Sequence, residues 1–288
     1  MEAPTLFVVM GPTASGKSAV AEQISLWIDA DIINADAFQV YRGMDIGTAK
    51  PSNQDRYHLL DIRNPDEDFG VGEYVLLASK ILHEQFEKGN SVVICGGTGL
   101  YIRALIEQYT DLMPSPSVAL RQSLTKIDLD EAVTQLTELA PDVAYSVDLK
   151  NGVRVKRALE KQLSNQEPIQ FTIPPFHIQK IGIVPPPELS QQKIKHRTNE
   201  MFQNGWVNEV KELLSQGYGP GNPGFRALGY EAIAEYILEK GNDGDLRERI
   251  ESDTVRYAKR QRTWLRAEPN LIVYSDVSSA LDAIGHPA

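Results

Sequence analysis

The sequence predicts an α/β fold, with a parallel sheet flanked by helices, an all-helical insertion and further helices toward the C-terminus. In the first part of the chain, short apolar runs alternate with helical patterns. The runs expected to form strands are residues 6–10, 31–35, 58–62 and 91–95. Helical periodicity is found at residues 17–28, 71–87 and 100–106. Because helices separate the strands, we expect parallel pairing through right-handed crossovers.

This alternation stops after residue 112, which is the observation that predicts an insertion. Residues 112–116 are typical of a linker, and helical periodicity then extends from residue 116 to about residue 162. Residues 178–184 resemble a strand that returns to the sheet and ends at three consecutive prolines. We therefore expect a core formed by residues 1–112 and 176–288, with a helical insertion domain at residues 113–175.

The last part of the chain is predicted to be mainly helical. Further helices are expected at residues 189–203, 207–215, 227–238 and 245–266. Residues 271–274 are β-like, but the sequence leaves their position in the sheet open.

Composition limits the classes of protein to consider. The chain has 288 residues, 42% of them hydrophobic, which is enough for a large core. The single cysteine, Cys95, lies in an apolar run and is expected in the core, so no disulfide or cysteine-based metal site is expected. No apolar run approaches the roughly 18 residues of a membrane span. We expect a cytoplasmic protein, without a membrane partner and as a monomer.

The formal net charge of -10 argues against nucleic acid as a partner, but the basic residues are clustered. Between residues 256 and 266 there are five basic residues and no acidic one: Arg256, Lys259, Arg260, Arg262 and Arg266. A second cluster contains Lys150, Arg154, Lys156, Arg157 and Lys161. Either cluster could also be the solvated face of a helix, and the sequence alone leaves both alternatives open.

A phosphate-binding pattern follows the first predicted strand. Residues 11–18, G-P-T-A-S-G-K-S, fit G-x-x-x-x-G-K-[S/T] between a strand and a helix. In this pattern the loop amides and the N-terminus of the helix face the phosphates, a lysine adds a charge, and a hydroxyl holds Mg²⁺. The candidate diphosphate-binding residues are therefore Gly11, Thr13, Ala14, Ser15, Gly16, Lys17 and Ser18, with Ser18 as the metal-binding hydroxyl. The pattern predicts a P-loop-type core.

The ends of two other strands carry further candidates. In a parallel sheet, ligands bind beyond the carboxyl ends of the strands. Asp36 follows the second run and is expected to face the phosphate loop, although an aspartate here is also typical of a turn. Thr98 lies among glycines after the fourth run and is expected to cap the next helix while its hydroxyl points at the site. Gly96 stands where nucleotide hydrolases often carry a metal-binding aspartate, which disfavours an ATPase.

Several segments together resemble one family, the tRNA dimethylallyltransferases (tRNA isopentenylpyrophosphate transferases). The matching segments are residues 11–18, N-A-D at 34–36, Q-V-Y-R-G-M-D-I-G-T-A-K-P at 39–51, G-G-T-G-L-Y-I-R-A-L at 96–105, R-A-L-E at 157–160, R-x-x-x-M at 197–201, A-L-G-Y-E at 227–231 and Y-A-K-R-Q-R-T-W at 257–264. They extend over nearly the whole chain in the order of the family. The segments at 34–51, 96–105 and 257–264 are much more specific than the phosphate loop, which many enzymes share.

The resemblance implies transfer of a dimethylallyl group from dimethylallyl diphosphate to the exocyclic N6 of the adenosine immediately 3′ of the tRNA anticodon. Asp36 matches the family's general base. Lys17, Thr98 and Arg197 match positions that handle the diphosphate, with Thr98 expected near the bridging oxygen and Mg²⁺ as the cofactor.

The same resemblance implies contacts to the tRNA anticodon stem-loop. The target adenine must leave its stack to reach the pocket, and Gln39 is the candidate for contacts to the extruded base. The candidate contacts to the rest of the RNA are Arg154, Arg157, Lys259, Arg260 and Arg262.

The chain departs from the family pattern in three places. Ala37 replaces the usual serine after the aspartate, Lys150-Asn151 replaces the usual Asn-Asp, and the insertion is short. Three alternative functions stay open: prenyl transfer to free adenine nucleotides, an ATP-dependent small-molecule kinase, and a non-catalytic RNA-binding protein.

Overall fold

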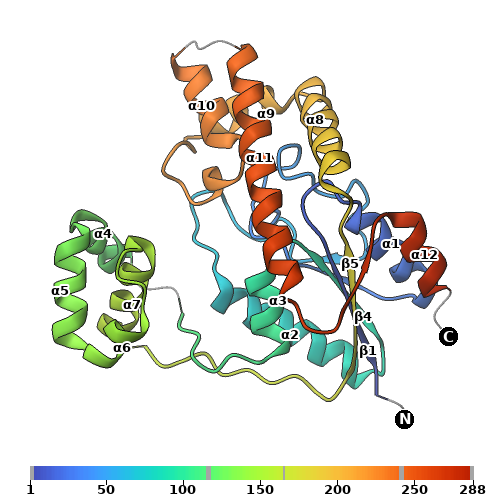
Figure 1. Cartoon of the computed structure of the whole chain (residues 1–288), viewed down its shortest axis with the longest axis horizontal. Coiled ribbons are helices and arrows are strands. Elements are labelled where there is room, and N and C mark those ends of the chain that lie inside the picture. Colours follow the sequence, from blue (N-terminus) through green and yellow to red (C-terminus); the bar gives the residue numbers. More distant parts are fainter. Residues whose placement is uncertain (1–2, 115–117, 165, 240–242, 286–288) are drawn as a thin grey trace.

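The centre of the molecule is a parallel sheet (Figure 1). The computed structural model describes residues 3–114, 118–164, 166–239 and 243–285. Within these ranges the sheet has six strands in the order β3-β2-β4-β1-β5-β6, and every neighbouring pair is parallel. The strands are β1 (Thr5–Met10), β2 (Ile32–Asn34), β3 (Tyr57–His58), β4 (Val92–Gly96), β5 (His177–Ile183) and β6 (Leu271–Tyr274). The predicted α/β class is confirmed.

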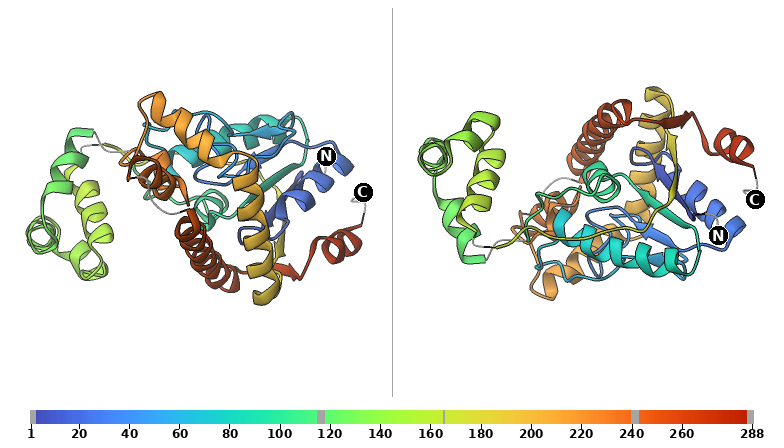
Figure 2. Two further views of the ribbon diagram at one scale, coloured as in Figure 1. Left: turned by 90° about the horizontal axis from the view of Figure 1, so that it is seen from above. Right: turned by 90° about the horizontal axis from the view of Figure 1, so that it is seen from below.

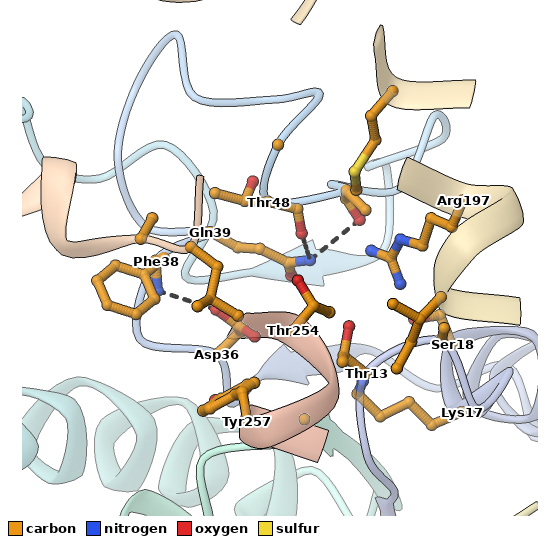
Figure 3. A pocket seen from close by; sticks show the side chains of 18 of the residues that line it. Thr13, Lys17, Ser18, Asp36, Phe38, Gln39, Thr48, Arg197, Thr254 and Tyr257 are labelled. Carbon is orange, nitrogen blue, oxygen red and sulfur yellow. Dashed lines mark hydrogen bonds between the residues drawn. The ribbon is translucent and has the colours of Figure 1, made fainter. Parts of the chain in front are cut away.

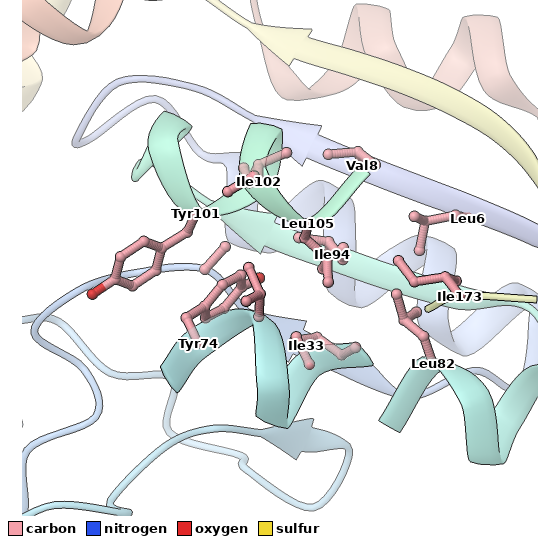
Figure 4. Close-up of a cluster of buried hydrophobic side chains, with 14 of the residues drawn as sticks. Leu6, Val8, Ile33, Tyr74, Leu82, Ile94, Tyr101, Ile102, Leu105 and Ile173 are labelled. Carbon is pink, nitrogen blue, oxygen red and sulfur yellow. The ribbon is translucent and has the colours of Figure 1, made fainter. Parts of the chain in front are cut away.

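Both faces of the strands β1, β2 and β4 are buried, which is why these strands read as continuous apolar runs. On β1, Leu6 and Val8 pack on one face, whereas Phe7 and Val9 pack on the other. The first face is covered by α2 (Val71–Glu87) and α3 (Gly99–Ile106), as Figure 4 shows. The second face is covered by α1 (Lys17–Ile28) and α12 (Val277–Ile284).

A second hydrophobic cluster lies beyond the carboxyl edge of the sheet. It packs the chain after β2, through Val40, Tyr41 and Met44, against Phe202 and Trp206. The C-terminal elements in this region are α8 (Pro187–Gln203), α9 (Trp206–Ser215), η1 (Gly224–Arg226), α10 (Tyr230–Glu239) and α11 (Asp243–Arg266). These helices thereby cover the edge of the sheet where ligands bind.

The inserted segment is helical, as predicted, and has a hydrophobic cluster of its own. Its helices are α4 (Val118–Lys126), α5 (Leu129–Leu139), α6 (Pro141–Ser146) and α7 (Gly152–Leu163). Figures 1 and 2 show them to one side of the sheet, joined to it by two lengths of chain. These two connections are hydrogen-bonded to each other through Ile169 N and Leu112 O, at 2.7 Å. Residues 115 and 116 of the predicted linker lie outside the described residues.

The structure differs from one strand prediction and gives the position of a strand that the sequence left open. The strand expected at residues 58–62 is wrong beyond His58, because Leu59 and Asp61 have φ values of 65° and 54°. Such left-handed residues interrupt an extended strand. Residues 271–274, whose position was open, form the edge strand β6 beside β5. None of the described helices is both long and apolar enough to cross a membrane.

Candidate active site

A cavity of about 350 Å³ lies between the sheet edge and the C-terminal helices (Figure 3). Its walls come from the phosphate loop, the ends of β2 and β4, the loop after β2, and helices α8 and α11. The predicted site residues that line it are Thr13, Ala14, Lys17, Ser18, Asp36, Gln39, Arg197 and Arg260. The fold therefore brings together candidates that are up to 247 residues apart in the sequence, since Thr13 and Arg260 meet at one cavity.

The other phosphate-loop residues, Gly11, Ser15 and Gly16, do not line the cavity but determine the conformation of the loop. Gly16 has a φ of 94° and Ala14 one of 59°, so the backbone turns through the left-handed region just before α1. A Cβ at Gly11 would lie 2.6 Å from Ile183 O, so only glycine fits between the loop and β5. Ser15 is buried, and its Oγ accepts a hydrogen bond from Lys17 N at 3.4 Å. These contacts hold the start of α1 toward the cavity.

Two of the cations that line the cavity, Lys17 and Arg197, lie on the same side of it. Figure 3 shows Lys17, Ser18 and Arg197 on one side and Asp36 on the other, with Gln39 between them. Burial lowers the pKa of both Lys17 and Arg197, and the charge of Asp36 partly opposes this effect. Two partly desolvated cations close together favour an anionic ligand, because such a ligand replaces the solvation they have lost.

Asp36 is held at the cavity wall by hydrogen bonds of its side chain and its backbone. Its Oδ1 accepts a hydrogen bond from Phe38 N at 2.9 Å, and its backbone N donates to Asn34 Oδ1 at 3.2 Å. Asn34 is buried and also donates to Leu59 O at 3.1 Å. The turn that Asp36 forms is therefore compatible with a functional carboxylate, because its side chain lines the cavity.

Thr98 differs from the expectation. It lies at the N-cap of α3, but its side chain makes no cap hydrogen bond. Instead its Oγ1 accepts a hydrogen bond from Ala37 N at 3.2 Å, and it is not among the residues that line the cavity. The expected side-chain cap is wrong because the hydroxyl is engaged by the residue that follows Asp36.

Gln261 is a residue that the sequence analysis missed as part of the site. Its side chain is buried, accepts a hydrogen bond from Thr13 N at 2.8 Å and donates one to Gly97 O at 3.1 Å. It therefore fastens the phosphate loop and the glycine turn after β4 to α11. Two signals in the sequence could have identified it. Gln261 lies in the matched segment at 257–264, and its spacing from Ile250, Thr254 and Tyr257 puts these four residues on one helix face.

That face of α11 forms a wall of the cavity, and Tyr257 is its aromatic component. Burial, followed by the charge of Asp36, raises the pKa of the Tyr257 hydroxyl, so it stays protonated at neutral pH. Arg260 is exposed and lies over the Tyr257 ring, with Cζ 5.5 Å from the ring centroid. The helix thus presents an aromatic surface and a cation at the mouth of the cavity.

The RNA-contact candidates separate into three groups. Lys259 and Arg260 are exposed on α11, as an RNA-contacting face requires. Arg262 instead donates to Pro185 O and to the Ser190 hydroxyl, so it fastens α11 to the start of α8. Arg262 is half-buried, and its contact with RNA stays a prediction.

The other two RNA candidates lie on α7 of the insertion, away from the cavity. Arg154 and Arg157 are both exposed, and Arg157 pairs with Glu160 at 2.6 Å. Asn151, one of the departures from the family pattern, caps this helix by accepting a hydrogen bond from Arg154 N at 3.2 Å.

Cys95 is buried as expected, but it also contributes to the floor of the cavity. Burial raises the pKa of its thiol to about 11, which keeps it protonated and unreactive at neutral pH. Among the described residues, no group of three or more His, Cys, Asp or Glu side chains could hold a metal ion.

The fold and the site together define a P-loop-type protein in which the phosphate loop and a carboxylate line one cavity. The comparisons specify the class further. The model of the "IPP transferase" family matches residues 39–268, and that of the "Isopentenyl transferase" family matches residues 4–64. Because the first match covers more than half of the chain, the chain belongs to the IPP transferase family.

Named relatives resemble nearly the whole chain. The tRNA dimethylallyltransferase of Geobacter sulfurreducens is 37% identical over 281 residues, covering 92% of this chain and 89% of the relative. That of Pelotomaculum thermopropionicum is 35% identical, covering 91% and 87%. The solved tRNA isopentenylpyrophosphate transferase of Bacillus halodurans has a TM-score of 0.70 at 28% identity, covering 96% and 90%. A eukaryotic dimethylallyltransferase acting on tRNA has a TM-score of 0.79 at 22% identity, covering 97% and 76%, which shows a shared fold.

Proposed function

We propose that this chain transfers a dimethylallyl group from dimethylallyl diphosphate to the exocyclic N6 of the adenosine immediately 3′ of the tRNA anticodon. The products are the prenylated tRNA and diphosphate. The observation that carries the proposal is that a single cavity contains a cationic phosphate-loop side and the carboxylate of Asp36. Family membership and the named relatives support it.

The reaction exchanges one bond for another. The N6 lone pair attacks the allylic carbon that carries the diphosphate, a C–N bond forms, and the C–O bond breaks. An adenine amino group is a poor nucleophile, because its lone pair is delocalised into the ring, but its N–H becomes acidic as the C–N bond forms. Asp36 lies on the cavity wall and accepts this proton as the general base.

The phosphate side stabilises the leaving group. Negative charge accumulates on the diphosphate as the C–O bond breaks, and the Lys17 and Arg197 cations face the same cavity. Because this charge is greatest in the transition state, fixed cations and loop amides lower the barrier rather than only tightening binding. Thr98 takes a positioning part by holding Ala37, the neighbour of Asp36.

The residues present fit a magnesium ion that is bound mainly through the substrate. The Ser18 hydroxyl is exposed at the cavity beside Lys17, and Asp36 is a carboxylate in the same cavity. Mg²⁺ prefers oxygen ligands and commonly keeps waters and phosphate oxygens around it, so a full protein cage is not needed. Ser18 would hold the ion, which when bound neutralises charge on the diphosphate.

The RNA approaches the site over the exposed basic residues of α11. Lys259 and Arg260 are exposed and contact RNA phosphates, Arg260 beside the cavity that it lines, and Gln39 lines the interior where an extruded adenine would lie. Arg154 and Arg157 on the insertion contact the anticodon stem farther from the cavity. The proposed enzyme acts on tRNA in the cytoplasm as a monomer.

The test is a product analysis. Unmodified tRNA is incubated with the protein, dimethylallyl diphosphate and Mg²⁺, then digested to nucleosides for mass spectrometry, with AMP as a parallel substrate. We expect dimethylallyl-adenosine from the position next to the anticodon and slower turnover of AMP. Faster turnover of AMP would favour the free-nucleotide alternative, and absence of product from either substrate would contradict the proposal.

A further inference from the structure

Glu209 on α9 binds three consecutive backbone amides of the loop that follows β2. Its Oε2 accepts hydrogen bonds from Asp45 N at 2.8 Å and Ile46 N at 2.7 Å, and its Oε1 accepts one from Gly47 N at 3.3 Å. The Tyr230 hydroxyl on α10 donates a fourth, at 2.6 Å. A carboxylate with four donors directed at it fixes this part of the loop more firmly than a single cap does.

The surrounding packing leaves this loop no room to move toward α9. A Cβ at Gly47 would lie 2.1 Å from Trp206 Nε1 and 2.5 Å from a ring carbon of Tyr230. Trp206 and Tyr230 are both buried, and their rings pack edge to face at 5.7 Å. Burial, followed by the Glu209 carboxylate, raises the pKa of Tyr230 well above its usual value, so its hydroxyl remains a donor.

The anchored segment leads directly to Gln39 in the cavity. The two residues after Gly47 present their carbonyls to the Gln39 side chain, whose Nε2 donates to Thr48 O at 3.0 Å and Ala49 O at 3.1 Å (Figure 3). Two carbonyl acceptors require the amide nitrogen on that side. With both amide hydrogens engaged, the Gln39 oxygen is the group that remains for a base in the cavity.

We propose that Glu209 is a positioning residue that selects an amino-bearing base, by fixing the loop that orients the Gln39 amide with its oxygen toward the substrate. Adenine carries a donor at its 6 position, whereas guanine carries an acceptor there, so a fixed amide oxygen favours adenine and repels guanine. This inference rests on the proposed function and concerns specificity at the same site.

A double-mutant cycle tests whether Glu209 acts through Gln39. The variants are Glu209→Ala, Gln39→Ala and the double variant, assayed for kcat/KM with tRNA. We expect each single variant to lose about tenfold. The kcat/KM of the double variant should lie within about twofold of that of the less active single variant, because both changes remove the same contact. KM for dimethylallyl diphosphate should stay unchanged.

A binding measurement tests the base preference without turnover. Anticodon stem-loops that carry adenosine or guanosine at the target position are compared by fluorescence anisotropy. We expect the wild-type preference for adenosine to fall about tenfold in Glu209→Ala. Glu212→Gln is the matched control, since Glu212 is exposed on the same helix, and it should keep the wild-type preference.

Thermal melting separates positioning from damage to the fold. If Glu209→Ala does not fold, Tyr230→Phe removes one donor to Glu209 and takes its place in the cycle. Multiplicative losses in the double variant, or an unchanged base preference in Glu209→Ala, would overturn the inference while the wild-type chain still formed product. A wild-type chain that forms no product would contradict the proposed function instead.

Discussion

At the scale of single residues, the site depends on where charge is placed rather than on unusual residue types. Lys17 and Arg197 are partly buried cations, and among the described residues neither forms an ion pair with a carboxylate. Asp36 is on the opposite side of the same cavity. This separation suits the two proposed substrates, because the diphosphate of one requires cations and the adenine of the other requires a proton acceptor.

Lys17 gives a pH-dependent prediction. Burial lowers the pKa of Lys17 from the ordinary lysine value of 10.5, so the free protein loses this proton at a lower pH than an exposed lysine does. Bound diphosphate favours the protonated form. The affinity of the protein for diphosphate should therefore be highest at a pH below the lowered pKa of Lys17. It should fall as the pH rises through that pKa. Calorimetric titration with pyrophosphate from pH 7 to about 10 measures this decline.

The control for this prediction is Lys17→Arg, which keeps the charge because a guanidinium stays protonated over the whole range. Its pyrophosphate affinity should lack the decline. An equal decline in this variant would assign the effect to another group.

At the scale of elements, α11 is the unit that completes the site. It fastens the phosphate loop through Gln261, contributes Tyr257 to the cavity wall, and packs Trp264 against the first residue of α3. The helix itself was predictable from its periodicity. The contacts of its faces were not, because a residue 248 positions away from Thr13 becomes its hydrogen-bond partner only after the chain has folded.

The packing of α11 against α3 gives a stability prediction. A Cβ at Gly99 would lie 2.0 Å from Trp264 Cε2, so Gly99→Ala forces a rigid indole to move. We expect a loss of about 1–3 kcal/mol in the free energy of unfolding, measured by urea denaturation. Gly70→Ala is the control, since nothing lies within 4 Å of its Cβ position. Equal stability of the two variants would contradict the close packing.

The exposed basic residues of α11 give a prediction about salt. Binding of the anticodon stem-loop should weaken as the ionic strength rises, because phosphate contacts release counterions. Replacing Lys259 and Arg260 by alanine should reduce the slope of log affinity against log salt by about 2, one for each lost phosphate contact. An unchanged slope would contradict RNA contact by these residues and favour the alternative that they only form the solvated face of a helix.

Arg262 shows why the basic cluster could not be resolved from the sequence. It is three residues beyond Lys259, but its side chain donates hydrogen bonds to Pro185 O and to the Ser190 hydroxyl. Composition identifies a cluster of charge, whereas the direction of each side chain depends on which helix face packs against α8. Thr98 is a similar case, since its hydroxyl accepts a hydrogen bond from the Ala37 amide instead of capping α3.

At the scale of the whole molecule, the sequence predicted the architecture well because both of its signals are local. Alternating apolar runs and helices specify a parallel sheet, and the loss of that alternation marks the insertion. The position of β6 was open because pairing with β5 is a long-range contact between short strands. We propose that residues 113–175 form a separate domain, which the cluster of α4 to α7 supports.

The overall acidic charge also becomes understandable at this scale. The net charge of -10 belongs to the chain as a whole, whereas the cavity and the exposed end of α11 carry local positive charge. A tRNA substrate responds to the local field near the site, and a negative remainder disfavours non-specific attachment elsewhere.

Whether Asp36 removes the proton from the attacking N6 is tested by the product yield of Asp36→Asn. The asparagine keeps the size and the backbone turn but accepts no proton. We expect the rate of dimethylallyl-adenosine formation, followed by nucleoside mass spectrometry, to fall by about 10²–10⁴-fold. Binding of the anticodon stem-loop should persist. A variant that forms product at the wild-type rate would contradict the assignment of Asp36 as the base.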